Sequence, residues 1–428
     1  MEARQADVAM ARDMPLGPLH GLPFTVKDLI ATAGVRTTAG SLVLKDYVPR
    51  VSAPAVSRLR AAGAILMGKS NCPEFGLDLH TSNRIFGDTW NPWNNRFTSG
   101  GSSGGDSAAV SAGMATFGVG TDYGGSIRFP AHCTGLACLR PTPGIVPGTG
   151  QLPYSADGDL PPPNSLSLQA WLQTIAPLAR STGDLAMLVR AMAGPDQLDS
   201  HTVPFELADP ERVYVRGLGC AWFDGDGTIP VRSDVRATVA TAAAALAGAG
   251  VRVVNERPPG FEEGEDAYAA LRAAEGLPDH AVLTSGRDQD LTAYLRIWLS
   301  SSQRTTTLGE YRALGARADR IRAQVTAYMT DWPILLLPVA SIPAFIPDQW
   351  DFDVEGTRVP RFNIETCCRV VTLLRMPAAV VICGTSIEGL PIGVQVVGKP
   401  FHDHEVLAVA QVLEREFGRW RPQGWRAA

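Results

Sequence analysis

Two runs rich in glycine and serine carry the side chains of this sequence that could perform chemistry. The first run covers residues 98–105 and contains Ser102. The second run covers residues 120–130 and contains Ser126 directly after two glycines. A glycine pair lets the backbone turn so that several N–H groups point at one place beside the Ser126 hydroxyl. A hydroxyl nucleophile beside converging N–H donors is what acyl transfer requires, because the donors stabilise the developing oxyanion.

A serine nucleophile also needs a base, and neither run contains a histidine. A neutral lysine can take this role in serine hydrolases. Lys27 follows the apolar segment 22–26, and burial there would lower the pKa of its amine. Only four of the 38 basic residues are Lys, and a buried Lys can lose its proton whereas an Arg cannot. The alternative is that both runs are flexible loops, and these residues alone leave both interpretations open.

Residues 63–70 match the phosphate-binding P-loop pattern letter for letter. A P-loop requires a strand, then a loop of free backbone N–H groups, then a helix. Here the central residues 64–67 are themselves apolar, and a helix is expected before them. We therefore predict a strand at this position and no phosphate site.

Residues 100–104 match the Gly-x-Ser-x-Gly nucleophile elbow of α/β-hydrolases, which would make Ser102 the nucleophile. That elbow must follow a buried strand, whereas residues 91–98 look like a loop. Its histidine would have to be His280, His402 or His404. The pair His402 and His404 also suggests a metal, but no third ligand cluster accompanies it, so we expect a solvated loop and no metal.

The composition excludes several classes of protein. The chain has 428 residues, 45% hydrophobic and 19% charged, with a net charge of −5, so nothing favours nucleic-acid binding. The apolar runs are too short to span a bilayer, and charged residues interrupt the first 30 positions where a signal peptide would be apolar. The seven cysteines are scattered, which favours reduced thiols. We expect a cytoplasmic protein without nucleic-acid or membrane partners.

The hydrophobic pattern alternates between strands and helices, which is typical of a layered α/β fold. Residues 91–107 contain too much Gly, Asn and Ser for a regular element before a helix resumes at 108–114. The predicted strands lie at 22–28, 64–67, 213–222, 251–254, 334–337 and 378–382. The predicted helices lie at 54–62, 180–193 and 235–249, over most of 260–330, and at 405–417.

The segment from Gly100 to Thr142 closely resembles the amidase signature family. It contains Gly-Gly-Ser-Ser-Gly-Gly, then Gly-Thr-Asp-x-Gly-Gly-Ser-Ile-Arg-x-Pro-Ala, then Gly-x-x-x-Leu-Arg-Pro-Thr, and 24 residues separate Ser102 from Ser126. Four further segments resemble the same family in the expected order, so the likeness covers nearly the whole chain. They are residues 17–28, 68–75, 87–94 and 389–398.

The resemblance implies a Ser-cisSer-Lys catalytic triad. Ser126 would be the acylated nucleophile and Lys27 the final base and acid. Ser102 would bridge them, held by a cis peptide bond after Gly101. The chain departs from the family in that Lys27 comes early, which implies either a late start or the lack of an N-terminal layer.

The resemblance also implies roles for the neighbours of the triad. The oxyanion hole would use the backbone N–H groups of Tyr123, Gly124, Gly125 and Ser126. The acyl pocket would be lined by Phe75, Gly76 and Leu77. Supporting residues, for which a purely structural role is the alternative, would be Ser103, Asp122 and Arg128. We expect a mostly apolar pocket with Trp171 near its entry, Arg128 as its only basic neighbour, and a preference for neutral aryl or alkyl acyl groups.

These inferences predict one α/β domain over residues 1–428, a mixed twisted β-sheet surrounded by helices as in the amidase signature fold. The signature core would cover about 20–190, a variable helical insertion about 200–330, and a C-terminal return to the core about 333–418. The predicted activity is hydrolysis of a carbon–nitrogen bond in a small or medium amide, without cofactor or metal, with esterase activity as an addition.

Two alternatives stay open for the function. A carbamate (urethane) or urea-type substrate would suit the same triad. A partner-dependent amidotransferase subunit is the alternative from another class, although the acidic charge balance argues against a tRNA partner. A homodimer is left open.

Overall fold

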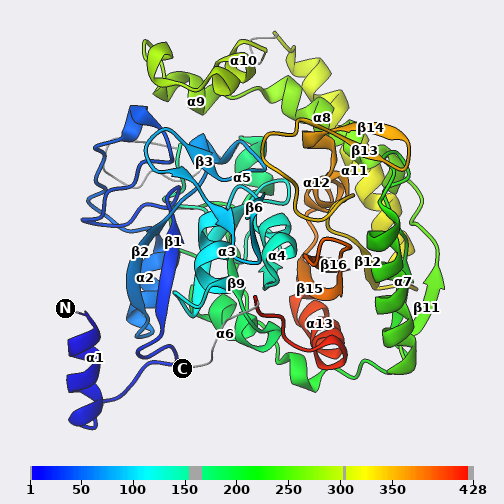
Figure 1. The fold of residues 1–428 in the computed structure, drawn as a ribbon, viewed down its shortest axis with the longest axis horizontal. Helices are drawn as coiled ribbons and strands as arrows, with labels where there is room; N and C mark the ends of the chain where they lie inside the picture. Colours follow the sequence, from blue (N-terminus) through cyan, green and yellow to red (C-terminus); the bar gives the residue numbers. More distant parts are fainter. Residues whose placement is uncertain (1, 154–165, 302–304, 423–428) are drawn as a thin grey trace.

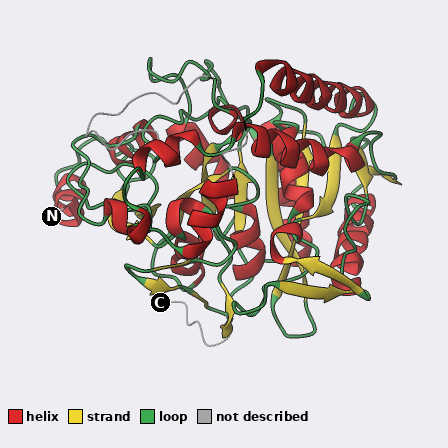
Figure 2. Ribbon diagram, turned by 90° about the horizontal axis from the view of Figure 1, so that it is seen from above, coloured by secondary structure: helices red, strands yellow, loops and turns green. Residues whose placement is uncertain are grey.

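A ten-stranded mixed sheet runs through the molecule, with helices on both sides of it (Figures 1 and 2). The structure is a computed structural model that describes residues 2–153, 166–301 and 305–422. From one edge to the other the strands are β11 (Arg252–Asn255), β10 (Gly219–Trp222), β12 (Ile334–Pro338), β16 (Pro391–Gly398), β15 (Ala378–Thr385), β8 (Ala137–Arg140), β9 (Thr174–Ala179), β7 (Phe117–Asp122), β1 (Pro23–Lys27) and β2 (Ile65–Ser70).

Thirteen α-helices are present in the described residues. They are α1 (Glu2–Ala11), α2 (Pro54–Ala61), α3 (Gly104–Ser111), α4 (Arg128–Thr134), α5 (Leu168–Leu172), α6 (Thr182–Met192), α7 (Ser233–Gly248), α8 (Gly264–Glu275), α9 (Pro278–Leu283), α10 (Ala293–Ser301), α11 (Leu308–Tyr328), α12 (Thr366–Leu373) and α13 (Asp403–Phe417). Three small hairpins pair β3 (Ser82–Asn83) with β4 (Gly87–Asp88), β5 (Trp90–Asn91) with β6 (Asn94–Thr98), and β13 (Asp351–Val354) with β14 (Thr357–Pro360).

The central strands are continuous apolar runs because both of their faces are covered. In β12, Ile334 and Leu336 point into a core shared with α2, α6, α7 and α13. The alternate side chains Leu335 and Leu337 point into a core shared with α8, α11 and α12. This alternation follows from the two-residue repeat of a strand, and it fixes which helices lie on each face.

Helices α8, α9 and α10 form a layer at one end of the molecule, at the top of Figure 1. They belong to residues 200–330, which also add β10 and β11 to the sheet, as expected from the apolar runs at 213–222 and 251–254. The division into a core, an insertion and a C-terminal return stays a prediction.

The N-terminal helix α1 lies against the edge strand β2. The Glu2 carboxylate accepts a hydrogen bond from the Leu66 N–H at 3.2 Å and pairs with Arg60 of α2. No residue of α1 is buried, and Val8 and Met10 are exposed apolar side chains on it. The helix therefore rests on the body of the molecule through a few polar contacts.

Most of the predicted elements are present, including an α/β sheet surrounded by helices. Residues 65–70 form the edge strand β2 directly after helix α2, so the P-loop match is a coincidence of letters, as predicted. Residues 91–98 were expected to be a loop, but they form most of the hairpin β5–β6, which lies outside the main sheet.

Helix α3 begins at Gly104, four residues before the predicted start. Its glycines serve close packing. A side chain at Gly105 would come within 2.3 Å of the Asn71 backbone, and one at Gly104 equally close to the Thr81 hydroxyl. The glycine content that argued against a helix here reflects this tight contact.

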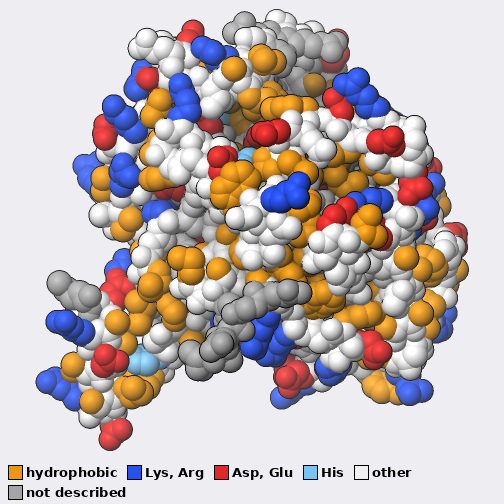
Figure 3. All heavy atoms as spheres, viewed as in Figure 1, with side chains coloured by type: hydrophobic (Ala, Val, Ile, Leu, Met, Phe, Trp, Pro, Cys, Tyr) orange, Lys and Arg blue, Asp and Glu red, His pale blue; other side chains and the backbone are white. Residues whose placement is uncertain are grey.

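The surface charges and the lengths of the apolar helices can be described directly. Basic and acidic side chains are intermixed on the face shown in Figure 3, without a continuous basic patch. Among the described helices, none is long and apolar enough to cross a bilayer.

Candidate active site

Lys27 ends β1, the strand next to the edge of the sheet, between β2 and β7, and its side chain is fully buried. Its Nζ donates hydrogen bonds to three hydroxyls: Ser102 Oγ at 2.7 Å, Ser103 Oγ at 3.0 Å and Thr121 Oγ1 at 2.9 Å. An ammonium has three N–H donors, so each finds an acceptor. The structure thus brings Lys27 together with Ser102, as the sequence predicted. Thr121, which follows Gly120 in the second run, was not singled out from the sequence.

Burial lowers the pKa of Lys27 to about 8, because a charged amine loses its hydration there. The neighbouring Cys72, Asp106 and Asp122 oppose this shift without cancelling it. An amine with a pKa of about 8 is partly neutral near neutral pH. Lys27 can therefore accept a proton as well as donate one.

Ser102 stands just before α3 and is buried. The peptide bond between Gly101 and Ser102 is cis, as the resemblance implied. A side chain at Gly101 would lie 2.3 Å from the Asp78 carbonyl, so this position requires glycine. The next residue, Ser103, donates its backbone N–H to the Ser126 carbonyl at 3.0 Å. The two glycine- and serine-rich runs are thus directly joined, and neither is a free loop.

Ser126 lies in the turn between β7 and α4 and is partly exposed. Asp122, the last residue of β7, holds this turn: its carboxylate accepts from the Gly125 N–H at 3.1 Å and from the Ile127 N–H at 3.3 Å. Gly125 has φ +133°, and a side chain there would lie 2.5 Å from Glu365 Oε2. Glycine is therefore required at 125 by both conformation and space.

This geometry corrects the predicted set of oxyanion donors. The Gly125 N–H is bound to Asp122 and is not available to a substrate. The N–H groups of Gly124 and Ser126 have no acceptor among the described residues. The hydrogen bond from the Gly125 N–H to Asp122 fixes the turn, and it thereby also fixes the directions of the Gly124 and Ser126 N–H groups.

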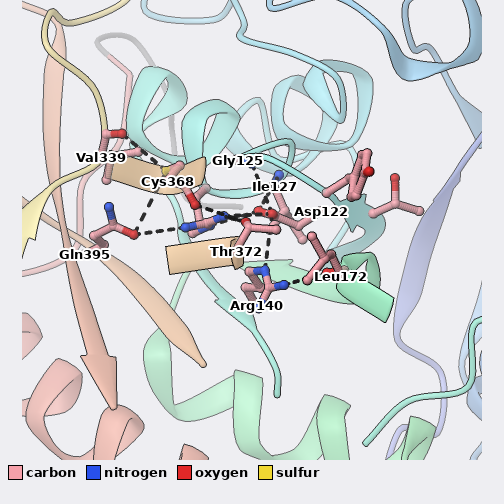
Figure 4. A network of polar contacts seen from close by, with 12 residues as sticks. Asp122, Gly125, Ile127, Arg140, Leu172, Val339, Cys368, Thr372 and Gln395 are labelled. Carbon is pink, nitrogen blue, oxygen red and sulfur yellow. Dashed lines mark hydrogen bonds and ion pairs between the residues drawn. The ribbon is translucent and has the colours of Figure 1, made fainter. Parts of the chain in front are cut away.

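Asp122 is the centre of a buried polar network (Figure 4). Arg128 of α4 donates to both Asp122 oxygens, at 3.0 and 2.9 Å, and Arg140 of β8 lies 3.5 Å from the same carboxylate. Burial alone would raise the pKa of Asp122, but the two guanidinium groups and hydrogen bonds hold it at about 2. Arg128 also donates to Gln395 of β16 and to Thr372 of α12. The network therefore ties the turn of Ser126 to four other elements.

A small cavity of about 30 Å³ is lined by both Ser102 and Ser126. The predicted pocket residues Phe75, Gly76 and Leu77 line it too. Phe75 is buried, and its ring packs edge-on against His280 with centroids 5.4 Å apart. The structure thus places all three predicted pocket residues beside the two serines.

Two expectations about the surroundings of this cavity are wrong. Trp171 does not line it; its ring packs against His201 and under the Arg375 guanidinium at 4.6 Å. Arg128 faces Asp122 instead of the cavity, and the basic residue that lines the cavity is Arg272 of α8.

Sequence reasoning also missed further residues that line the cavity, among them Gln169, Gln173, Leu277 and His280. They lie in or directly beside α5 and α9. Nothing in their sequence spacing indicates that these segments would cover the two serines. Burial lowers the pKa of His280 to about 3, which keeps it neutral.

The histidine-based alternative is not supported by the geometry. Ser102 has Lys27 as its hydrogen-bond partner, and the described part of the chain shows no histidine bonded to its hydroxyl. His402, His404 and Glu405 gather at the start of α13 with their ligand atoms within 4.8 Å of one another, but none of the three lines the cavity.

Comparisons with known proteins identify the family. The model of the amidase family matches residues 1–407. The chain belongs to the amidase family, whose members are hydrolases acting on carbon–nitrogen bonds, and this confirms the resemblance found in the motifs.

Individual relatives and structures cover almost the whole chain. A glutamyl-tRNA(Gln) amidotransferase subunit from Synechococcus sp. (strain CC9902) is 32% identical over 444 residues, covering 97% of this chain and 86% of the relative. A structure described as an unexpected vestigial protein complex that reveals the evolutionary origins of an s-triazine catabolic enzyme superposes with TM-score 0.87 at 31% identity, covering 99% and 89%. A crystal structure of an amidase superposes with TM-score 0.80 at 29% identity, covering 97% and 89%.

Proposed function

We propose that this chain is an amidase that hydrolyses its substrate through an acyl-enzyme on Ser126. The observation that carries the proposal is the buried Lys27 amine 2.7 Å from Ser102 Oγ, with Ser102 and Ser126 lining one cavity. The order of exposure supports a relay: Lys27 and Ser102 are buried, and Ser126 is partly open. A proton leaving Ser126 then has a path inward to the amine.

The proposed reaction begins with neutral Lys27. Lys27 takes the proton of Ser102 while Ser102 takes that of Ser126, and Ser126 Oγ attacks the amide carbon. The Gly124 and Ser126 N–H groups, with that of Tyr123 as predicted, receive the oxyanion. The Lys27 ammonium returns its proton through Ser102 to the leaving amine, the carbon–nitrogen bond breaks, and the acyl group stays on Ser126. Water then repeats the sequence and releases the acid.

Replacing the nucleophile tests this assignment. Ser126→Ala should lower kcat by several orders of magnitude, because it removes the hydroxyl that forms the acyl-enzyme. A fluorophosphonate probe should label wild type on the peptide that contains Ser126, as mapped by mass spectrometry. Label on Ser102 instead would contradict the proposal and favour the nucleophile-elbow alternative.

The nature of the scissile bond is a separate matter, because the same groups can attack a carbamate, a urea or an ester. We propose the amide as the preferred substrate on the basis of the family. Comparing kcat/KM for an amide, a carbamate, a urea and an ester that share one acyl group tests this. A carbamate exceeding the amide by more than about tenfold would identify a urethanase instead.

The similarity to subunits of glutamyl-tRNA(Gln) amidotransferase makes a partner-dependent role the second candidate. We propose that the chain acts without a partner, since Lys27 is hydrogen-bonded to Ser102, and Ser102 and Ser126 line one cavity, within the single chain. The purified chain should hydrolyse amides alone, and its mass in solution should distinguish a monomer from a homodimer. Activity that depends on adding other subunits would favour the amidotransferase candidate.

We also propose a cytoplasmic location. All seven cysteines are buried free thiols, as is usual for proteins of a reducing compartment.

A further inference from the structure

Arg272 of α8 stands between two cavities. The inner cavity of about 30 Å³ is lined by the two serines. The outer cavity of about 350 Å³ is lined by Tyr268, Trp298 and neighbours in the helical layer, Glu265 included, and by Asn363 and Arg369. Arg272 and Leu277 line both. The inner cavity has room for little more than one or two water-sized groups, so it suits the scissile carbonyl alone. The outer cavity adjoins the inner one at Arg272 and Leu277, so it is the space available there for the rest of a substrate.

Aromatic rings hold the Arg272 side chain. Its guanidinium carbon lies 4.9 Å from the ring centroid of Tyr123 and 4.9 Å from that of Trp298, with Tyr268 at 6.0 Å. Stacking fixes the plane of a guanidinium while its N–H edge stays available for hydrogen bonds. Tyr123 also begins the turn that carries Ser126, so this cation is positioned relative to the nucleophile.

The charge of Arg272 is not neutralised by a carboxylate. Arg272 forms no ion pair within the described residues. The two nearby acids attract Arg272 through space, but their ion pair and hydrogen bond are with other groups: Glu265 pairs with Arg369 at 2.7 Å, and Glu275 accepts from the Leu168 N–H. The residues lining the inner cavity include no Asp or Glu, and His280 is neutral there. A cation without an ion-pair partner among the described residues therefore lines the same cavity as Ser126.

We propose that Arg272 determines specificity by binding a carboxylate of the substrate, so that the preferred substrates are amides carrying a carboxylate group. This inference rests on the proposed amidase activity. A planar guanidinium binds a planar carboxylate through two parallel charge-assisted hydrogen bonds. The apolar wall of Phe75 and Leu77 would contact the hydrocarbon near the scissile carbonyl. This replaces the sequence-based expectation of a preference for neutral acyl groups.

Matched substrate pairs test the proposal. The monoamides of succinic, glutaric and adipic acid are compared with neutral isosteres in which an isopropyl group replaces the carboxylate. Wild type should prefer the charged partner at the best chain length. Arg272→Met should lower that preference, measured as a ratio of kcat/KM values, by about 30- to 100-fold, the usual effect of losing a charged hydrogen bond. Arg272→Lys should restore part of it.

Arg296→Met is the matched control, because Arg296 is an exposed cation on α10 that lines neither cavity. It should leave the preference as in wild type. An equal preference in wild type, Arg272→Met and Arg296→Met would overturn the proposal. Neutral-amide hydrolysis that still requires Ser126 would show that only the role of Arg272 had failed, whereas hydrolysis independent of Ser126 would mean that the proposed function itself had failed.

A binding measurement covers the case in which Arg272→Met does not fold. Calorimetric titration of glutaric monoamide into Ser126→Ala should give a Kd at least tenfold lower than titration into Ser126→Ala with Arg272→Lys, since lysine keeps the charge but not the paired hydrogen bonds. Equal affinities would contradict carboxylate binding at this position.

Discussion

At the scale of single residues, Lys27 combines two properties that oppose each other. Its three hydroxyl partners favour a charged amine, whereas burial lowers its pKa to about 8 and favours a neutral one. A group balanced in this way can serve as a base in one step and as an acid in the next. The sequence predicted Lys27 because an apolar segment before a rare lysine indicated burial. Nothing comparable indicated Arg272, since an arginine on an amphipathic helix is usually solvated.

The first prediction concerns proton delivery by Lys27. Lys27→Ala should depress hydrolysis of an amide far more than that of a p-nitrophenyl ester with the same acyl group, because an amine leaves only after protonation. General acid–base help is typically worth about 10²–10⁴-fold. The measurement is kcat/KM for both substrates in wild type and variant. Equal losses would remove the proton-delivery role and leave Lys27 as an activator of Ser126 only.

The second prediction concerns pH. Because the neutral form of Lys27 is the base, wild-type kcat/KM should rise with pH and level off above about 8, the lowered pKa of this amine. Activity should be lost as pH falls through that value, since protonation occupies the base. A pH–rate profile measures this, and a profile flat from pH 6 to 9 would exclude Lys27 as the titrating base.

At the scale of elements, the site depends on a few places where the backbone packs so closely against neighbouring atoms that only glycine fits. The first helical turn of α3 and the turn after β7 are both glycine-rich for this reason. Composition alone suggested irregular structure at the start of α3. The sequence does not reveal that the Asn71 backbone packs against these glycines. The central strands were predictable because helices cover both of their faces, and this leaves a continuous apolar run in the sequence. The position of α8 and α9 above the serines was not, because it follows from tertiary packing.

The third prediction compares two neighbouring glycines of the Ser126 turn. Gly125→Ala should lower kcat by about 10²-fold or more, the typical effect of displacing oxyanion donors, because its φ is +133° and the new methyl would meet Glu365. Gly124→Ala is the control: its nearest contacts, Tyr268 and Arg369 at 3.1 and 3.4 Å, are side chains that can shift. Steady-state kinetics on one amide measures both, and similar losses would contradict the predicted difference.

At the scale of the whole molecule, residues distant in the sequence are joined through one carboxylate. Asp122 and Arg128 connect β7 and α4 with β8, α12 and β16, so the motif region and the C-terminal return stabilise each other. The sequence predicted both parts as one family-like fold. It left the role of Asp122 and Arg128 undecided, because the partners Thr372 and Gln395 lie more than 240 residues away.

The fourth prediction follows from that network. Asp122→Ala should lower the free energy of unfolding by about 3–5 kcal/mol, because it leaves Arg128 buried without its partner. Asp122 has a folded pKa of about 2, below its ordinary value, so its contribution is present above about pH 4 and is lost as pH falls through 2. Urea unfolding at neutral pH measures the difference, with Arg128→Met added in a second variant. A double variant no more stable than Asp122→Ala would contradict the explanation by an unpaired charge.

The contact between α1 and β2 has a consequence for how copies of this chain meet one another. β2 is the last strand of the sheet, so its outer side presents backbone groups to which a strand of another molecule could add. The Glu2 carboxylate occupies the Leu66 N–H on this strand, and α1 stands beside it. With α1 in this place, a strand of another molecule could pair with the outer side of β2 only after the Glu2 contact to Leu66 had been broken.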